Sequence, residues 1–302
     1  MTRRLPVVPP KPAPLAGKGT SLGADAWRRL RRNRLALGGA ILLVLIGGAC
    51  FVLPWILGLD PRTTSPRDYF QAPSGAHPLG TDALGRDYLA RVLVGGRTSL
   101  LVGLVATAAS MLIGVTYGAV AGYFGGKIDE VMMRLVDFGY AIPYMFLVIL
   151  ITLMFSQEAR GSAVPVFVGL GLVQWLTMAR IVRGEVQALR NREYVLAAQV
   201  LGASDGHILL RHILPNILPI VVIYATLTVP AVIILESFLS YLGLGVELSW
   251  GQLVAEAVGV VNPIRSYWWL LVGPSVALAA TLFCLNFLGD GLRDAIDPRT
   301  RS

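Results

Sequence analysis

Six long runs of apolar residues constrain the fold of this chain more than any other feature. Apolar residues make up 55% of the 302 residues, 15% are charged, and the mean hydropathy is +0.64. A helix needs roughly 20 mostly apolar residues to cross a bilayer. The sequence therefore predicts an all-α fold, a polytopic membrane bundle of six transmembrane helices. The runs comprise residues 35–57, 99–123, 141–155, 164–181, 217–236 and 267–288.

Two of these runs depart from a simple span. The run 141–155 is short and contains Pro143, so we expect its helix to begin several residues earlier. The first run follows several arginines, as in a secretory signal peptide, whose apolar core is about 7–15 residues long. This run is longer and ends at residues 51–55 in Phe-Val-Leu-Pro-Trp. An uncleaved membrane helix is therefore favoured.

The excess positive charge lies at the N-terminus and predicts the orientation. Residues 1–34 hold nine basic residues against Asp25 alone, which accounts for the formal net charge of +8. They are Arg3, Arg4, Lys11, Lys18, Arg28, Arg29, Arg31, Arg32 and Arg34. Under the positive-inside rule such a block is cytoplasmic and contacts anionic lipid heads. We therefore expect a multi-pass protein with both termini in the cytoplasm and no nucleic-acid partner.

This topology divides the chain into segments. The loops 124–140 and 182–216 then lie inside, and the loops 58–98, 156–163 and 237–266 lie outside. The predicted organisation is a flexible Pro-rich cytoplasmic tail (1–24), an anchor helix with an extracytoplasmic loop (25–96), a main transmembrane domain (97–290) and a cytoplasmic C-terminal tail (291–302).

Cysteine and histidine usage indicates no metal site and no catalytic cluster. Cys50 and Cys284 lie far apart in apolar runs, so no disulfide framework follows. His77, His207 and His212 share no ligand-like spacing with a cysteine or carboxylate. An intramembrane enzyme would need a nucleophile with a base, or a metal, and the sequence shows neither.

The spans contain one notable ionisable residue. Glu236 lies at the outer end of the fifth run, and such residues are functional hypotheses by default. With Ser240 and Trp250 it forms our candidate gate or pathway; the alternative is a solvated Glu236 at the membrane interface. Prolines in or near spans hint at a translocation path, because they free backbone groups that must face protein or water. They are Pro165, Pro219, Pro230 and Pro274.

The loop 182–216 carries the most informative pattern. Residues 183–201 predict a helix, and Gly202 is a plausible C-terminal cap because glycine adopts positive φ freely. Ser204 can cap a second helix with Asp205 in its first turn, and Pro215 ends that helix. Its apolar residues are Ile208, Leu209, Leu210, Ile213 and Leu214, and its polar residues are Asp205, His207, Arg211 and His212. Such a helix either lies on the membrane or docks into a partner.

The spacing in this loop resembles the "EAA" loop of ABC-importer permeases. Ala197, Ala198, Gly202, Leu214 and Pro215 match that pattern. The family usually has glutamate at the position of Leu196 and often isoleucine at that of His212. The resemblance implies that the segment from Gly202 through Ala203 to Pro215 is a coupling helix, which inserts into a groove on a nucleotide-binding subunit.

Further stretches resemble the dipeptide/oligopeptide importer permeases and extend the match over residues 25–300. They are His-Pro-Leu-Gly-Thr-Asp (77–82), Gly-Arg-Asp (85–87), Gly-Arg-Thr-Ser-Leu (96–100), residues 236–245, Ser-Trp-Gly (249–251) and residues 286–294. The resemblance implies a type I ABC-importer permease in the inner or plasma membrane of a prokaryote. It also implies three partners: a second homologous permease, two nucleotide-binding units and an extracytoplasmic binding protein that docks where the 58–98 loop and Ser-Trp-Gly are exposed.

Every fourth residue of the second run is small. Such a stripe lets another backbone approach closely, either within the chain or across a dimer interface with a second permease. The stripe consists of Ala106, Ser110, Gly114, Gly118 and Gly122.

No phosphate-binding loop is recognisable, so we expect this chain to bind no cofactor and its partners to use ATP and Mg. The nearest match to G-x-x-x-x-G-K-[ST] is Gly-Lys-Gly-Thr at residues 17–20, where a glycine separates the lysine from the threonine. Alternatives remain open: relatives carry nickel complexes, glutathione or other small solutes. An ion-coupled secondary transporter would need coupling groups near the midplane, where the spans offer little beyond Glu236.

Overall fold

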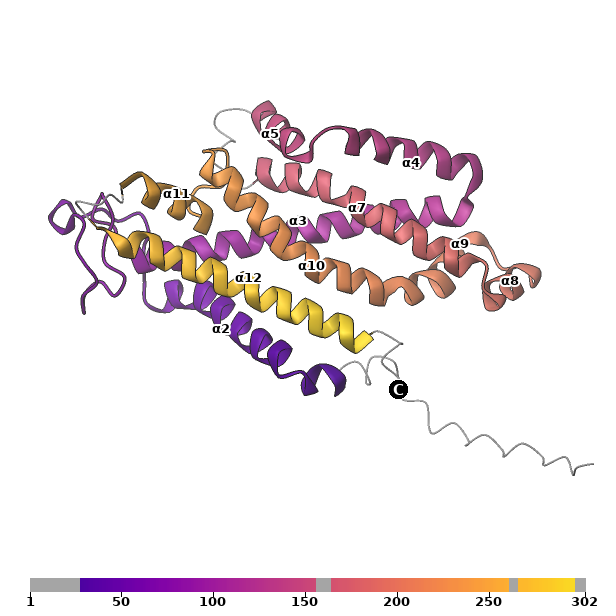
Figure 1. Ribbon diagram of the computed structural model, residues 1–302, viewed down its shortest axis with the longest axis horizontal. Helices are drawn as coiled ribbons and strands as arrows, with labels where there is room; N and C mark the ends of the chain where they lie inside the picture. The colour runs from indigo at the N-terminus through magenta and orange to yellow at the C-terminus, as the bar shows by residue number, and fades with distance from the viewer. Residues whose placement is uncertain (1–27, 156–163, 261–265, 297–302) are drawn as a thin grey trace, which may run out of the picture.

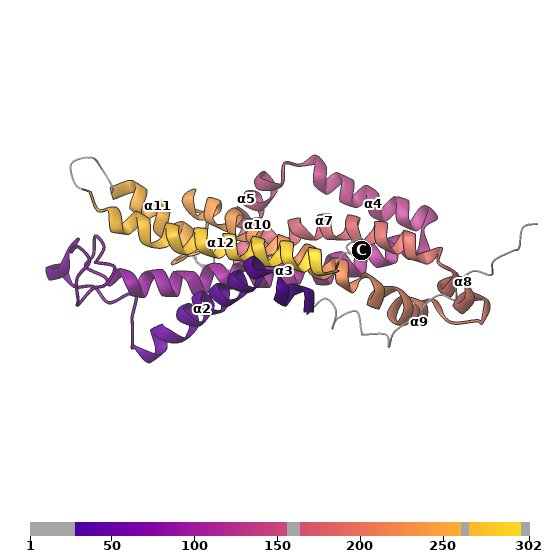
Figure 2. The same ribbon diagram turned by 60° about the horizontal axis from the view of Figure 1, so that its bottom comes forward.

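The computed structural model describes residues 28–155, 164–260 and 266–296, and it forms an elongated helix bundle (Figures 1 and 2). Its described regular structure is helical, apart from a single bridge between Thr81 and Asp87. Five described helices are long and apolar enough to cross a membrane, and a sixth span results if one bent pair is counted together. The predicted all-α membrane bundle is confirmed.

The elements follow one another along the chain with these bounds. They are α2 (Arg34–Ile56), η1 (Pro66–Asp68), α3 (Tyr88–Phe124), α4 (Gly126–Ala141), α5 (Tyr144–Met154), α7 (Val164–Arg190), α8 (Glu193–Val200), α9 (Asp205–Ile208), the π-helical turn η2 (Leu209–Ile213), α10 (Leu214–Tyr241), α11 (Trp250–Val260) and α12 (Trp268–Ile296).

The long helix α3 is the centre of the bundle and packs its small-residue stripe against α7. All five stripe residues are buried. A Cβ added to Gly118 would lie 2.9 Å from Val182 Cβ, and one added to Gly122 would lie 2.9 Å from Val186 Cβ. The stripe therefore serves packing within the chain. The predicted domain boundary between residues 96 and 97 falls inside α3, where the helix is continuous.

Helix α2 lies beside α12 (Figure 1). The side chain of Asn33 caps α2 by accepting hydrogen bonds from the N–H groups of Leu35 and Ala36, both at 3.2 Å. Gly291 packs against Ala36, so a side chain there would collide with α2. The predicted C-terminal tail from residue 291 is therefore wrong, because α12 continues against α2 as far as Ile296. The predicted N-terminal tail, 1–24, lies outside the described residues.

The predicted inner loop 124–140 and the third span differ from expectation. Most of this loop is the helix α4, which lies along α7 and is tied to it by Asp129, whose carboxylate accepts two hydrogen bonds from Arg183 at 2.5 and 2.6 Å. The third apolar run is not one straight helix, since α5 begins only at Tyr144; the span begins earlier than residue 141, as expected, if the bent pair α4–α5 is counted as one. An angle of 87° separates α4 from α5, because Pro143 opposes continuation of the helix.

The predicted helix 183–201 is interrupted. Helix α7 ends at Arg190, and Arg192 is extended with φ −77° and ψ 145° before α8 begins. The Asn191 side-chain amide donates to the carbonyl oxygen of Gln187 at 3.4 Å and satisfies one of the last carbonyls of α7. Asparagine competes with the helix in this way, and the resulting turn lets α8 pack back on the bundle through Val195.

The predicted stop at Pro215 is also wrong. Elements α9, η2 and α10 follow one another without a gap. The N–H of Leu214 bonds to the carbonyl of Leu209, five residues back, so the chain enters α10 through a π-helical turn. Pro215 then lies in the first turn of α10, a position at which helices tolerate proline.

The two ends of the bundle are built differently (Figures 1 and 2). One end carries α8 and α9, and we call it the α8–α9 end. The other carries residues 58–87 and α11, and we call it the cap end. The predicted outer loop 237–266 is in part the helix α11, which packs against α3, α10 and α12.

Candidate functional site

A tight turn at Gly202 joins α8 to α9. Gly202 has φ +80°, which confirms the predicted glycine cap. Its N–H donates to the carbonyl of Gln199 at 3.0 Å, and the N–H of Ala203 donates to that of Ala198 at 3.1 Å. These two bonds form a Schellman motif, which satisfies the last carbonyls of α8 and reverses the chain. Ser204 occupies the predicted N-cap position of α9, but its hydroxyl makes no capping hydrogen bond.

One face of the segment after Gly202 is packed on the chain itself. Ile208 and Ile213 are fully buried, in a cluster with Val182 and Val195. The Tyr123 hydroxyl donates to the Asp205 carboxylate at 2.7 Å and anchors the start of α9 to α3. The interpretation that this segment lays its apolar face on the membrane is therefore wrong for these two isoleucines.

Large apolar side chains are exposed on α8, at the turn before Gly202 and on η2. The exposed fractions are 88% for Val200, 86% for Leu201 and 70% for Leu210, and Tyr194 and Leu196 are exposed as well. We call these five residues the apolar patch. Exposed groups of large apolar residues mark interaction sites in folded proteins. Helix α8, which carries or adjoins four of these residues, forms the outermost part of the α8–α9 end (Figure 1).

The other predicted residues of this loop border the patch. Those that are exposed are Ala197, Gly202, Ser204, Asp205, His207, Arg211 and Pro215. Those that are half-buried are Ala198, Ala203, Leu209, His212 and Leu214. The His212 ring lies 5.8 Å from the His207 ring and 6.4 Å from the Tyr194 ring, measured between centroids.

Glu236 is fully buried, so its solvated alternative is wrong. The Ser240 hydroxyl donates to Glu236 Oε1 at 2.6 Å, and the Ser99 hydroxyl lies 3.5 Å from Oε2. Ser240 also lies 3.1 Å from Ser249 between their hydroxyl oxygens. These contacts tie α10 to α3 and to the start of α11.

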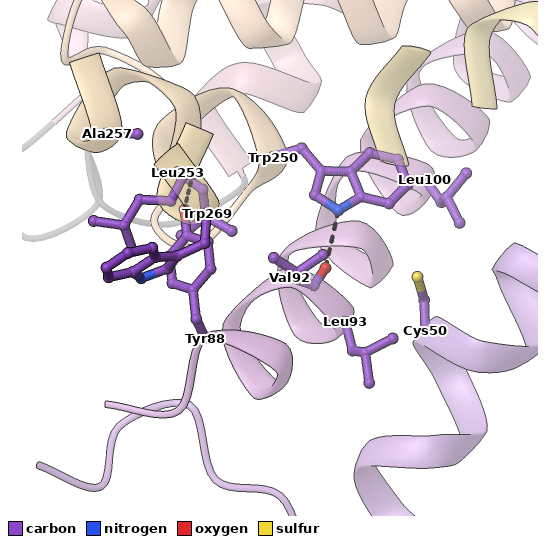
Figure 3. Packing of buried hydrophobic residues seen from close by; sticks show 10 residues of the cluster. Cys50, Tyr88, Val92, Leu93, Leu100, Trp250, Leu253, Ala257 and Trp269 are labelled. Carbon is purple, nitrogen blue, oxygen red and sulfur yellow. Dashed lines mark hydrogen bonds between the residues drawn. The ribbon is translucent and has the colours of Figure 1, made fainter. Parts of the chain in front are cut away.

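Trp250 is buried beside these residues, and Figure 3 shows its indole ring near Val92 and Cys50. Its backbone N–H donates to the Ser99 hydroxyl at 3.1 Å, and its indole N–H donates to the carbonyl of Val92 at 2.9 Å. The ring lies over Gly96 beside Cys50, where a side chain on Gly96 would collide with both. The expectation that Ser249, Trp250 and Gly251 are exposed is wrong, because all three are buried where α11 begins against α3 and α10.

A charged network closes the cap end and was not anticipated from the sequence. The Asp82 carboxylate accepts hydrogen bonds from Arg86 Nε at 2.6 Å and from Arg91 Nη1 at 2.8 Å. Arg91 also donates to both carboxylate oxygens of Glu256, at 2.7 and 3.1 Å. Burial alone would raise the pKa of Asp82, but the N–H groups of Arg86 and Leu84 and the Arg86 guanidinium outweigh it and hold the pKa below its usual value.

The pairing of these charges had no clear sequence signal. Arg91 lies in the predicted outer loop 58–98, before the second apolar run, whereas the structure places it in the first turn of α3. Glu256 is 165 positions away, so only the fold could pair the two residues. In the described part of the chain, no group of three or more His, Cys, Asp or Glu side chains could hold a metal ion.

Comparison with known proteins identifies the family. The family described as binding-protein-dependent transport system inner membrane component matches residues 114–302. The N-terminal TM domain of oligopeptide transport permease C matches residues 21–73. The chain is 44% identical to the oligopeptide transport system permease protein OppC of Haemophilus influenzae over 291 residues, covering 94% of this chain and 91% of that protein.

Other relatives and solved structures agree. The dipeptide transport system permease protein DppC of Bacillus subtilis is 41% identical, with 92% of this chain and 86% of that protein covered. The inward-facing MetNI methionine ABC transporter contains a chain with a TM-score of 0.56 at 20% identity, covering 68% of this chain and 96% of that one, which shows a shared fold. The resemblance stated from the motifs is confirmed: the chain belongs to the family of binding-protein-dependent transport system inner membrane components, as a permease of the ABC-importer type.

Proposed function

We propose that this chain is one of two permease subunits of an ATP-driven importer that carries peptides delivered by an extracytoplasmic binding protein. Its relatives are named as oligopeptide and dipeptide permeases, which supports the peptide substrate. ATP and Mg are used by two nucleotide-binding partner units, and a second homologous permease completes the path.

The apolar patch is the observation that carries this proposal. Its side chains are exposed around the Gly202 turn, which two backbone hydrogen bonds hold. The segment after the turn is fixed to the bundle by the buried side chains of Ile208 and Ile213. A rigidly mounted apolar patch fits a groove on a partner better than a membrane surface, since it projects from the end of the bundle (Figure 2). Motion of an ATPase unit against it would pass directly into α10, which continues from η2.

The charge distribution supports placing the α8–α9 end in the cytoplasm. The start of α2 and the end of α12 point toward the same end of the bundle as α8 and α9 (Figure 1). The basic cluster lies at the first residue of α2 and directly before it, and consists of Arg28, Arg29, Arg31, Arg32 and Arg34. By the positive-inside rule this end faces the cytoplasm, and the cap end then receives the binding protein.

The test is the substitution Gly202→Pro in the assembled transporter. Proline needs φ near −65° and lacks the N–H that bonds to Gln199, so the turn that mounts the patch is lost. Peptide uptake and the ATPase activity stimulated by loaded binding protein should both fall to background.

Gly184→Ala, in α7 and outside the coupling segment, is the control. A Cβ on Gly184 would meet nothing within 4 Å, so this variant should keep both activities. Survival of coupled ATPase activity and uptake in Gly202→Pro, with the protein folded, would remove the basis of the coupling assignment.

A further inference from the structure

A cavity of about 490 Å³ lies where the broken helix pair α4–α5 faces α7 and α10. Tyr140 and Tyr144 line it at the break, Gln174 and Thr177 line it from α7, and Ile234 lines it from α10. Gln174 is ten residues into α7, roughly 15 Å along the helix axis at 1.5 Å per residue. That is about half of the roughly 30 Å hydrocarbon core, so the cavity lies near mid-depth.

The break leaves polar backbone groups at this depth. The N–H groups of Phe146 and Leu147 bond to the carbonyl of Pro143, whereas that of Tyr144 has no backbone partner among the described residues. Non-helical backbone at membrane depth is tolerated only when it is buried in protein or lines a watery cavity. The N–H of Tyr144, at the rim of the cavity, is therefore available to a ligand.

The facing wall adds an unpaired side-chain amide. Gln174 is half-buried and makes no side-chain hydrogen bond within the described part of the chain. An amide offers two donors and one acceptor, and leaving them unpaired in lipid would be costly. At the edge of the cavity the Tyr140 hydroxyl and Thr177 Oγ1 lie 2.7 Å apart and bond each other. The Gln174 amide and the N–H of Tyr144 are therefore the groups that have no partner within the described part of the chain.

An ion pair borders the cavity on the side of the α8–α9 end. Arg180 Nη2 lies 2.8 Å from Asp137 Oδ1, and its guanidinium carbon lies 4.2 Å from the centroid of the Tyr140 ring. Both charged side chains are about half exposed, so they remain open to a solute.

We propose that this cavity is a peptide-binding station on the translocation path, where Gln174 and the N–H of Tyr144 hydrogen-bond the peptide main chain. An amide pairs with a peptide bond whatever its side chains, and the apolar walls accept varied side chains without selecting among them. A volume of about 490 Å³ is within the usual range for small-ligand pockets. This inference rests on the proposed function, because it requires that peptides enter the bundle.

Cysteine accessibility in the assembled transporter, reconstituted in vesicles, tests the station. Gln174→Cys should react with a charged methanethiosulfonate reagent, because the path admits water. Loaded binding protein is then added, with trialanine at ten times its dissociation constant for the station. Because bound peptide covers the cysteine, the rate of labelling should fall about tenfold. Wild type is the blank, since Cys50 and Cys284 are buried.

Phe283→Cys is the matched control. Phe283 is 64% exposed on α12, on the side of the bundle away from α4 and α5 (Figure 1). Its thiol should face lipid and show no protection by peptide. If Gln174→Cys fails to react, the second permease covers this face and the station is rejected. A reaction that peptide leaves unchanged rejects it equally.

Transport kinetics provide an independent measurement. Gln174→Leu keeps a similar volume and is apolar, so the helix should fold, but the amide contacts are lost. We expect the KM for trialanine uptake to rise about fivefold to tenfold, as for one or two lost hydrogen bonds. An unchanged KM alongside normal uptake overturns the station and leaves the proposed function intact. Absence of trialanine uptake in wild type would instead overturn the peptide substrate.

Discussion

At the scale of single residues, the Asp82 carboxylate holds several segments of the cap end together. Its carboxylate accepts from the backbone of Leu84 and Arg86 and from the side chains of Arg86 and Arg91. Arg91 is buried and continues the contact to Glu256 on α11. Through Arg91 the carboxylate thereby links the loop of residues 58–87, the start of α3 and α11. A buried charge network of this kind is strongly destabilised when one member is lost.

Asp82→Asn should lower the stability of the purified protein by about 1–3 kcal/mol near neutral pH. The pKa of Asp82 is depressed in the folded state, so its contribution is present above the unfolded value of about 3.9 and is lost as the pH falls through the folded value. The difference in Tm between wild type and variant should therefore shrink below about pH 4. Thermal unfolding in detergent from pH 7 to acid pH measures this.

Asp60→Asn, in the same loop but on an exposed carboxylate, is the control and should change Tm much less. A Tm difference for Asp82→Asn that stays constant through acid pH would show that the carboxylate charge contributes nothing.

At the scale of elements, the contact between α3 and α7 depends on the absence of side chains. Gly114, Gly118 and Gly122 bring the α3 backbone against α7, and lipid offers no hydrophobic drive for helix association. Close packing is therefore the main attraction between these two helices. The broken pair α4–α5 is packed less closely. Pro143 prevents α4 from continuing into α5, and the cavity lies beside this break.

Gly118→Val should destabilise the bundle by about 1–3 kcal/mol or more, because its Cβ would meet Val182 and the backbone at Ala179. Loss of Tm and of yield in detergent measures the effect. Gly47→Val on α2 is the control, because nothing lies within 4 Å of a Cβ there. Equal Tm values for the two variants would contradict the packing role of the stripe.

At the scale of the whole molecule, the short helix α8 carries one valine that is buried in the bundle and another that is exposed for a partner. Val195 on α8 is fully buried in the cluster with Ile208, whereas Val200 on the same helix is 88% exposed. The first valine stabilises the chain, and the second has no packing role within it. The same substitution at both positions therefore distinguishes stability from partner binding.

Val195→Asp should lower Tm strongly, because it buries an unpaired charge. Val200→Asp should leave Tm unchanged but weaken association with the nucleotide-binding units about tenfold to a hundredfold, as expected for removing one buried apolar side chain from an interface. Differential scanning fluorimetry and co-purification measure the two effects. Normal co-purification of the Val200→Asp protein would exclude this residue from the docking surface.

Local chemistry explains which features could be predicted from the sequence. Long apolar runs specify membrane helices, because a bilayer leaves the backbone few alternatives. Glycine at residue 202 specifies its turn, because only positive φ allows the two Schellman bonds. The motifs at residues 77–82 and 249–251 indicated the family, although residues 80–82 and 249–251 proved to be buried structural contacts rather than exposed ones.

The errors arose from local details that helix propensity does not resolve and from contacts between distant segments. Residues 183–201 and Pro215 were predicted from propensity, but Asn191 turns the chain and a π-helical turn carries it past the proline. The burial of Glu236 and Trp250 depends on α11 folding back against α3 and α10.

The sequence alone determined the membrane bundle, the small-residue stripe, the turn at Gly202 and the family, because each depends on residues close together in the chain. Only the tertiary structure decided which residues are buried and which remain free. Arg91 and Glu256 are paired, the apolar patch is left in solvent, and Gln174 faces a cavity because helices far apart in sequence come together. The physical reason is that burial and pairing are properties of packed neighbours, which periodicity cannot specify.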